Sequence, residues 1–487
     1  MSQPSIRKNF LMNALLTMSS FLFPLITFPY VSRILGPGGT GTVTFAVSVV
    51  AYFNMFAQLG IPTYGIRACA QVRDDKEQLS RTAHELFFIS CIMSVLSYIA
   101  LFVCIHAVPR LRAEKTLIAI VSINILLNTI GFEWMYKALE QYTYITIRSI
   151  VFKFIAVIAM FLLVHHPEDY VVYGAINVLA SSASFFLNLI NVRKYIFLRP
   201  VGGYRLRRHL KPVAVFFAMA CATTIYTNLD TVMLGFMTTD VDVGYYNAAV
   251  KIKTILVSVV TSLGAVLLPR ASYYVEHGEL DRFYEITRKS LRFVLLLAAP
   301  LMLYFIFYAR EGVLLLSGPA YDGAVLPMQY IMPTLLFIGL TNILGLQMLV
   351  PLGREKTVLW SEIAGAVTDV ILNAILIPRM GAAGASLGTL AAEFVVLIVQ
   401  YAALRDTVQS TFLSLPYGKV ALALAAGSAA SLWVRALGWS SFPALVVSAV
   451  CFFGAYGAVL LLTREPFTRE MVDLVLAKVL KRPGREA

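Results

Sequence analysis

The chain has 487 residues, of which 59% are apolar and only 14% charged, and its mean hydropathy is +0.75. Soluble globular chains carry about a quarter charged residues, so this composition excludes an ordinary soluble enzyme and a disordered chain. A net charge of +13 suggests nucleic acid only in a soluble protein, and we expect no nucleic-acid partner here. The composition is that of a polytopic membrane protein.

Apolar windows separated by glycine, proline and charge clusters predict about 14 transmembrane helices. The segments are too long and too continuously apolar for barrel strands, so the predicted fold class is all-α. The predicted spans are residues 10–31, 41–60, 86–106, 117–137, 145–164, 170–191, 212–236, 248–269, 292–310, 325–350, 358–377, 383–404, 418–437 and 440–462.

The basic residues divide unevenly between alternate connections. Thirty of the 40 Lys and Arg residues lie on the side of the N-terminus, and seven lie on the opposite side. With an even number of crossings, the positive-inside rule then places both termini in the cytoplasm. The longest basic connection, Arg193–Lys211, holds seven Lys and Arg residues and no acid. We interpret it as a positive-inside linker, with contact to anionic lipid head groups as the alternative.

An internal repeat relates the two halves of the chain. LGPGGTGTVTFA (Leu35–Ala46) and LGFMTTDVDVGYYNAA (Leu234–Ala249) each run from Leu-Gly to a glycine five residues before an alanine, about 200 residues apart. Such repeats are typical of secondary transporters. The predicted organisation is two pseudo-symmetric six-helix lobes and a C-terminal helix pair: 1–195 (first lobe), 196–211 (basic cytoplasmic linker), 212–405 (second lobe), 406–462 (helix pair) and 463–487 (cytoplasmic amphipathic tail).

Ionisable residues inside apolar spans are costly, at about 2.5–3.5 kcal/mol for a central charge, so they usually face a cavity or a partner. The candidate cations are Arg33, Arg148, Lys153, Lys251 and Lys253, and the candidate acids are Asp230, Glu362, Asp369 and Glu393. Asp230 could instead have a structural role, as the partner of Lys251 or Lys253 in an ion pair across a short loop. Arg148 lies near a span end, where snorkelling is the alternative.

Polar residues at helical spacing form stripes on two of the spans. One stripe comprises Asn177, Ser181, Ser184 and Asn188, and another continues from Lys251 through Thr254 and Ser258. Such stripes either line a water-filled cavity or join helices by hydrogen bonds. We expect no cofactor and no metal, because no phosphate-binding loop and no cluster of metal ligands occurs. A membrane glycosyltransferase using Asp240 and Asp242 is the enzymatic alternative.

Six stretches resemble the polysaccharide (oligosaccharide) flippase family, of the superfamily of multidrug, oligosaccharidyl-lipid and polysaccharide exporters. In order they are FPYVSRILGPGGTG (Phe28–Gly41), GIPTYGIRACAQVRDD (Gly60–Asp75), EWMYKALEQYTYITIR (Glu133–Arg148), TNLDTVMLG with GYYNAAVKIK (Thr227–Lys253), LLPRASYYVE (Leu267–Glu276) and LGLQMLVPLGREK (Leu344–Lys356). One departure is Ala138, where the family would have glycine.

The resemblance implies a flippase, not an enzyme, that moves an undecaprenyl-diphosphate-linked repeat unit of O-antigen, capsule or exopolysaccharide to the outer leaflet by alternating access. The cations above would attract the diphosphate, the stripes would contact sugar hydroxyls, and the acids would bind a coupling proton or sodium ion. Membrane lipids and polysaccharide polymerase machinery are the other partners expected. A multidrug exporter and a peptidoglycan-precursor flippase are the alternatives.

Overall fold

The computed structural model describes residues 6–470, 472 and 473, and this part of the chain is helical, with no β-strand. Eleven of its helices are long and apolar enough to cross a membrane. A bent pair, Pro319–Ile331 with Thr334–Leu349, raises this number to 12 if it forms one span. The all-α polytopic fold is therefore confirmed, whereas the exact number of 14 spans is not.

The difference in number has three sources. Residues 10–31 and 41–60 lie in one long helix, α1 (Ile6–Gln58), which is interrupted at Gly36. Gly36 has a φ of 64° inside this helix, a value that glycine adopts without strain. The span predicted at 117–137 is the short apolar helix α5 (Lys115–Ile130), and the span at 325–350 is the bent pair.

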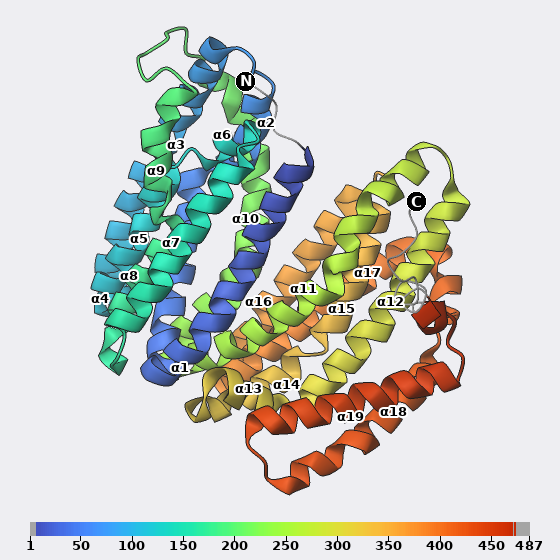
Figure 1. Cartoon of the computed structure of the whole chain (residues 1–487). Coiled ribbons are helices and arrows are strands. Elements are labelled where there is room, and N and C mark those ends of the chain that lie inside the picture. Colours follow the sequence, from blue (N-terminus) through green and yellow to red (C-terminus); the bar gives the residue numbers. More distant parts are fainter. Residues whose placement is uncertain (1–5, 471, 474–487) are drawn as a thin grey trace, which may run out of the picture. The chain divides into compact units, whose positions relative to one another are not determined.

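The chain divides after Asn247 into two compact units (Figure 1). The helices of the first unit are α1, α2 (Ile61–Ala70), α3 (Lys76–Ala107), α4 (Pro109–Ala113), α5, α6 (Glu133–Ala138), α7 (Tyr142–Leu163), α8 (Tyr170–Val178), α9 (Phe185–Asn191) and α10 (Arg207–Met237). A π-helical segment, Leu179–Ala183, joins α8 to α9. The division falls inside α11 (Asp240–Glu276), and the lobe boundaries drawn from the repeat stay a prediction.

The second unit contains the rest of α11 and the helices that follow it. These are α12 (Leu280–Phe307), α13 (Ala309–Ser317), α14 (Val325–Ile331), α15 (Thr334–Thr341), α16 (Glu355–Met380), α17 (Ala382–Leu413), α18 (Tyr417–Leu432) and α19 (Ser441–Leu462). A second π-helical segment, Asn342–Leu349, follows α15. The predicted amphipathic tail, 463–487, lies mostly outside the described residues.

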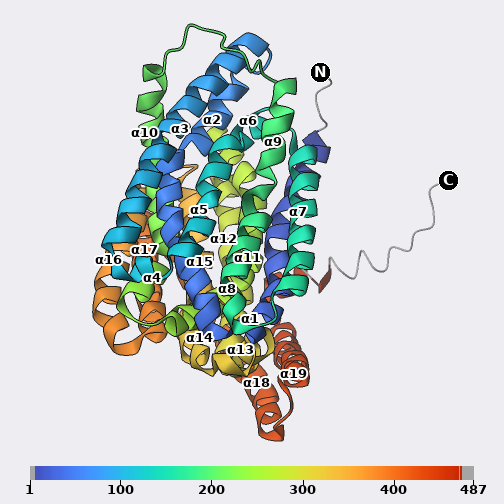
Figure 2. The ribbon, with the colours of Figure 1, turned by 90° about the vertical axis from the view of Figure 1, so that its left-hand side faces the viewer.

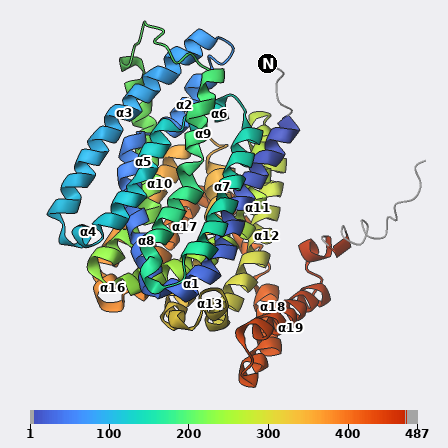
Figure 3. The same ribbon diagram turned by 60° about the vertical axis from the view of Figure 1, so that its left-hand side comes forward.

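Within the first unit, the connections group as the charge pattern predicts. The N-terminal end of α1, the helices α2 and α6 and the basic connection lie at one end of the bundle, and α4 lies at the other end (Figures 2 and 3). Asp75 caps α3 at the basic end by accepting the backbone N–H groups of Glu77 and Gln78. The Gln78 N–H holds the pKa of Asp75 below its ordinary value. Which end faces the cytoplasm stays a prediction.

Close packing between helices explains why two positions of the first unit are occupied by glycine. A Cβ atom at Gly65 of α2 would lie 2.7 Å from Cε3 of Trp134 on α6, so only glycine lets the indole ring pack there. Trp134 and the fully buried Met135 and Tyr136 belong to the hydrophobic cluster at this end of the bundle. A Cβ atom at Gly41 of α1 would overlap the backbone of Asp240 and Gly244 at the start of α11.

Candidate functional site

A buried ion pair lies inside the first unit. Nη2 of Arg148, on α7, is 2.6 Å from Oε2 of Glu133 at the start of α6, and only 2% of the Arg148 side chain is exposed. Arg148 also donates to the backbone carbonyl of Ser184, and its guanidinium lies 5.0 Å from the ring centroid of Phe185. The carboxylate of Glu133 thus compensates the charge that burial would otherwise make very costly.

The polar stripe of the sixth predicted span meets this ion pair at one of its ends. Asn188 is fully buried and donates to the carbonyl of Gly131, 2.5 Å away. Ser184 is buried, Asn177 is half-buried and donates to its own helix, and Ser181 is exposed and donates to Asn124. The π-helical segment between α8 and α9 interrupts the 3.6-residue spacing on which the predicted stripe rests, and the stripe stays a prediction.

The other two candidate cations of the first unit form hydrogen bonds with neutral groups instead of a carboxylate. Lys153 on α7 donates to the hydroxyls of Ser19 and Ser20 on α1, at 2.8 and 2.9 Å. Arg33 is exposed and donates to the carbonyl of Pro29 on its own helix. Lys153 is therefore a half-buried cation held by neutral hydroxyls, whereas Arg148 is held by a carboxylate.

Asp230 is buried near the end of α10 and accepts a hydrogen bond from the hydroxyl of Tyr246. Farther along α11, Lys251, Lys253 and Ser258 are half-buried and Thr254 is exposed. The hydroxyls of Thr254 and Ser258 donate to carbonyls of their own helix. Two cations and two hydroxyls thus lie within eight residues of α11, and their predicted role in lining a cavity stays a prediction.

The remaining candidate acids lie where α16 and α17 pack antiparallel. Nε2 of Gln400 donates to the hydroxyl of Ser361, and a Cβ atom at Gly388 would overlap the amide oxygen of Asn373. These two contacts fix the helix register and place Asp369 and Glu393 in the same stretch of the interface. Both side chains are buried, with 4% and 5% of their surface exposed, whereas Glu362 is half-buried about two turns nearer the Ser361 end of α16.

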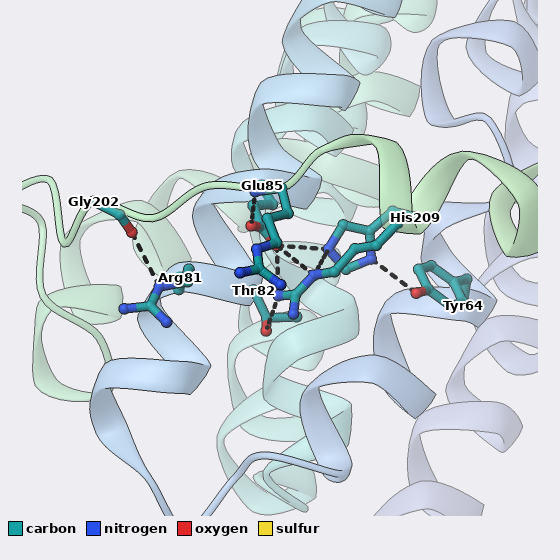
Figure 4. A network of polar contacts seen from close by, with 8 residues as sticks. Tyr64, Arg81, Thr82, Glu85, Gly202 and His209 are labelled. Carbon is teal, nitrogen blue, oxygen red and sulfur yellow. Dashed lines mark hydrogen bonds and ion pairs between the residues drawn. The ribbon is translucent and has the colours of Figure 1, made fainter.

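A further polar network was not predicted. Glu85 on α3 is fully buried. Its carboxylate accepts a hydrogen bond from Nη2 of Arg208 at 2.6 Å and lies 2.7 Å from Nε2 of His209 (Figure 4). Nδ1 of His209 lies 2.8 Å from the hydroxyl of Tyr64 on α2. The sequence signal is an acid one residue before the predicted span 86–106.

Comparison with known proteins identifies the family. The model of the family described as "Polysaccharide biosynthesis protein" matches residues 6–275, which is more than half of the chain. The chain belongs to this family. The MatE family model also matches, over residues 215–375. The "Putative O-antigen transporter" of Escherichia coli (strain K12) is 25% identical over 397 residues, which cover 80% of this chain and 95% of that protein.

Two solved structures share the fold. The lipid II flippase MurJ, in an inward closed conformation, matches with a TM-score of 0.62 at 16% identity and covers 93% of this chain and 99% of its own. An inward-facing multidrug resistance MATE family transporter of the MOP superfamily matches with a TM-score of 0.63 at 15% identity. This match covers 83% of the present chain and 99% of the transporter chain. The chain is thus a multi-pass membrane protein of this family. The glycosyltransferase alternative is set aside because the relatives are named as transporters.

Proposed function

We propose that this protein translocates undecaprenyl-diphosphate-linked oligosaccharide repeat units from the cytoplasmic to the outer leaflet of the bacterial inner membrane. The observation that carries the proposal is the match to an O-antigen transporter over 95% of that protein's length. The product would feed the synthesis of a surface polysaccharide, namely O-antigen, capsule or exopolysaccharide, through polysaccharide polymerase machinery. Both termini lie in the cytoplasm in this proposal.

The transport step needs charge attraction and no covalent chemistry. A diphosphate is strongly anionic, and the cations that would attract it in a low-dielectric cavity are Lys153, Lys251, Lys253 and Arg33. Lys153 suits this role because its present partners are neutral hydroxyls that a phosphate oxygen can replace. Arg148 is already neutralised by Glu133, so we assign it a structural role in this conformation. Hydroxyls and amides, such as those of Thr254, Ser258, Asn177 and Ser181, would contact the sugars.

We assign ion coupling to the buried stretch of the α16–α17 interface. Burial favours neutralising Asp369 and Glu393, and a proton or a sodium ion would do so. Binding there would change the charge between two closely packed helices, which is one way to couple an ion gradient to rocking of the lobes. Asp230 and Glu362 are the other candidates for this role.

The test is transbilayer movement of the lipid-linked oligosaccharide in liposomes that contain the purified protein. The substrate starts in one leaflet, and its appearance in the other is read by its cleavage with an added glycosidase. We expect movement above that of empty liposomes, and a dependence on a proton or a sodium gradient. No movement under either gradient, with proven insertion and a matched glycan, would reject the proposal.

A variant with Lys251→Ala and Lys253→Ala tests the head-group site. We expect it to lose most of the translocation because two cations near the proposed diphosphate path are gone. The matched control removes two exposed cations from α12 of the same unit, with Arg282→Ala and Lys289→Ala. Equal translocation by the two variants would remove Lys251 and Lys253 from the site.

Multidrug export is the second candidate, favoured by the MatE match over residues 215–375 and by the MATE-like fold. A drug exporter would confer resistance to cationic compounds when overexpressed and would leave surface polysaccharide unchanged when deleted. The flippase proposal predicts the opposite pair of results. A peptidoglycan-precursor flippase, which the MurJ-like fold favours, would be essential by itself.

A further inference from the structure

The basic connection Arg193–Lys211 is held firmly against α3. Its backbone contributes the N–H of Phe197, which donates to Ser80, and the carbonyl of Gly202, which accepts Nε of Arg81. The hydroxyl of Tyr204 lies 3.0 Å from Nδ1 of His84 and also accepts the N–H of Val201. These contacts recur along the whole connection, so it has a defined conformation against the bundle.

Glu85 fixes the far end of the connection, where α10 begins. Its carboxylate accepts the backbone N–H of Arg205 at 2.5 Å in addition to Arg208 and His209 (Figure 4). Four hydrogen bonds thus converge on one buried carboxylate, two of them from Arg208. Charge-assisted hydrogen bonds of this kind are about twice as strong as neutral ones, so the anchor is strong.

A pocket of about 180 Å³ lies between the anchored connection and the helices α3 and α9. Its lining is apolar and aromatic, apart from two polar side chains that hydrogen-bond each other. The lining residues are His84, Phe87, Phe88, Phe132, Leu189, Val192, Ile196, Leu198, Pro200 and Tyr204. The volume equals about six water molecules in the liquid, which suits a segment of hydrocarbon chain.

The mouth of this pocket is apolar and open. Leu198 is 64% exposed, Phe88 is 41% exposed and Leu189 is 37% exposed. Exposed apolar side chains around a pocket in a membrane protein indicate a face that lies against lipid chains. An aqueous ligand would leave these side chains in water, whereas a lipid would cover them.

Cations alternate with the pocket residues along the connection. Arg193, Lys194 and Arg199 are exposed and lie between the lining residues Val192, Ile196 and Pro200. Lys76 adds a fourth cation, with its Nζ 4.8 Å from the ring centroid of Phe197. Of the acids near the start of α3, Asp75 caps the helix and Glu77 pairs with Arg81, so the exposed Asp74 is outnumbered by the four cations. The rim of the pocket is therefore basic.

We propose that this pocket is a binding site for an anionic phospholipid of the leaflet that faces the basic connection. The phosphate group lies among Arg193, Lys194 and Arg199, and a segment of one acyl chain fills the pocket. Anionic lipids gather at the cytoplasmic leaflet, where each basic residue near the surface adds to the attraction.

The experiment uses the purified full chain in phosphatidylcholine vesicles with photoactivatable phosphatidylglycerol that carries a diazirine on one acyl chain. Phosphatidylcholine with the same diazirine chain is the control probe. We expect crosslinks from phosphatidylglycerol at the lining residues Phe88, Leu189 and Leu198, and at least severalfold fewer from phosphatidylcholine. Crosslinks of equal yield from both probes, or none at these residues, would overturn the proposal.

Two variants separate the head-group and chain parts of the site. Arg193→Ala with Arg199→Ala should lower the phosphatidylglycerol yield about tenfold, because two cations are lost. The matched control, Arg207→Ala with Lys211→Ala, removes two exposed cations of the same connection outside the pocket lining and should keep the yield within about twofold. Leu198→Trp should block the mouth and abolish the pocket crosslinks. Equal yields from the two double variants would contradict the assignment.

A competition arm identifies the source of the lipid. Unlabelled phosphatidylglycerol should displace the probe, and undecaprenyl phosphate at the same concentration should displace it less. Stronger displacement by undecaprenyl phosphate would overturn the phospholipid assignment and give the pocket to the polyprenyl carrier. Translocation in the liposome assay is read separately, so failure of the flippase proposal and failure of this one are distinguishable.

Discussion

Arg148 shows how one side chain can carry either a transport role or a structural one. It is 2% exposed and paired with Glu133, and it sits beside the rings of Tyr144 and Phe185. Removing one partner of a buried pair leaves the other charge uncompensated, which costs about 3–5 kcal/mol when both are fully buried. Glu133 is 20% exposed, so solvent reduces the cost here.

We therefore expect Arg148→Met and Glu133→Gln to be non-additive. Each single variant should lower the thermal unfolding midpoint in detergent, and the double variant should recover part of the loss, with a coupling of about 1–3 kcal/mol. Lys153→Met is the matched control, because its partners Ser19 and Ser20 are neutral and its coupling with Glu133→Gln should be near zero. Additive losses at Arg148 and Glu133 would show that the pair does not act as a unit.

At the scale of elements, the internal repeat has a packing consequence. Gly41 and Gly244 occupy matching places in the two copies of the repeat, and the structure brings them into contact where α1 meets α11. A Cβ atom at Gly41 would overlap the carbonyl of Asp240, and one at Gly244 would overlap the carbonyl of Pro37. The helices approach so closely that backbone meets backbone, which is typical of small residues at membrane helix interfaces.

Gly41→Ala and Gly244→Ala should each destabilise the protein by about 1–3 kcal/mol, because the extra methyl group forces the two helices apart. Gly38→Ala is the control on the same helix, since its Cβ would lie at an ordinary 3.8 Å from Val241. The measurement is the thermal unfolding midpoint of the three purified variants in one detergent. If Gly41→Ala unfolds at the same temperature as Gly38→Ala, the close contact does not stabilise the fold.

The sequence predicted the helices well and their polar contacts only in part. Hydropathy located the spans because lipid requires long apolar helices, but it does not predict that one helix continues past Gly36 or that residues 319–349 form a bent pair. Helical spacing predicts that four residues of the Ser and Asn stripe share one face, but it does not predict the π-helical segment that lies among them. The network around Glu85 joins residues more than 100 positions apart, and no local pattern reports such a contact.

At the scale of the whole molecule, the uneven distribution of the basic residues behind the net charge of +13 predicts how the chain is oriented in the membrane. Thirty basic residues on one set of connections and seven on the other predict cytoplasmic termini, and each unit contributes connections to both sides. The two units can therefore be tested separately with the same reagent. The five native cysteines are free and must first be replaced by serine or alanine.

Single cysteines at four exposed basic positions test the orientation of both units. Arg207→Cys and Arg405→Cys lie on predicted cytoplasmic connections, and Lys115→Cys and Arg379→Cys lie on the predicted outer side. We expect a membrane-impermeant maleimide to label the outer pair in intact spheroplasts and the inner pair only in inside-out vesicles. Reversal of all four would invert the molecule in the membrane and with it the leaflet of the lipid pocket. Labelling of Arg207→Cys and Arg405→Cys from opposite sides would instead refute an even number of crossings between them.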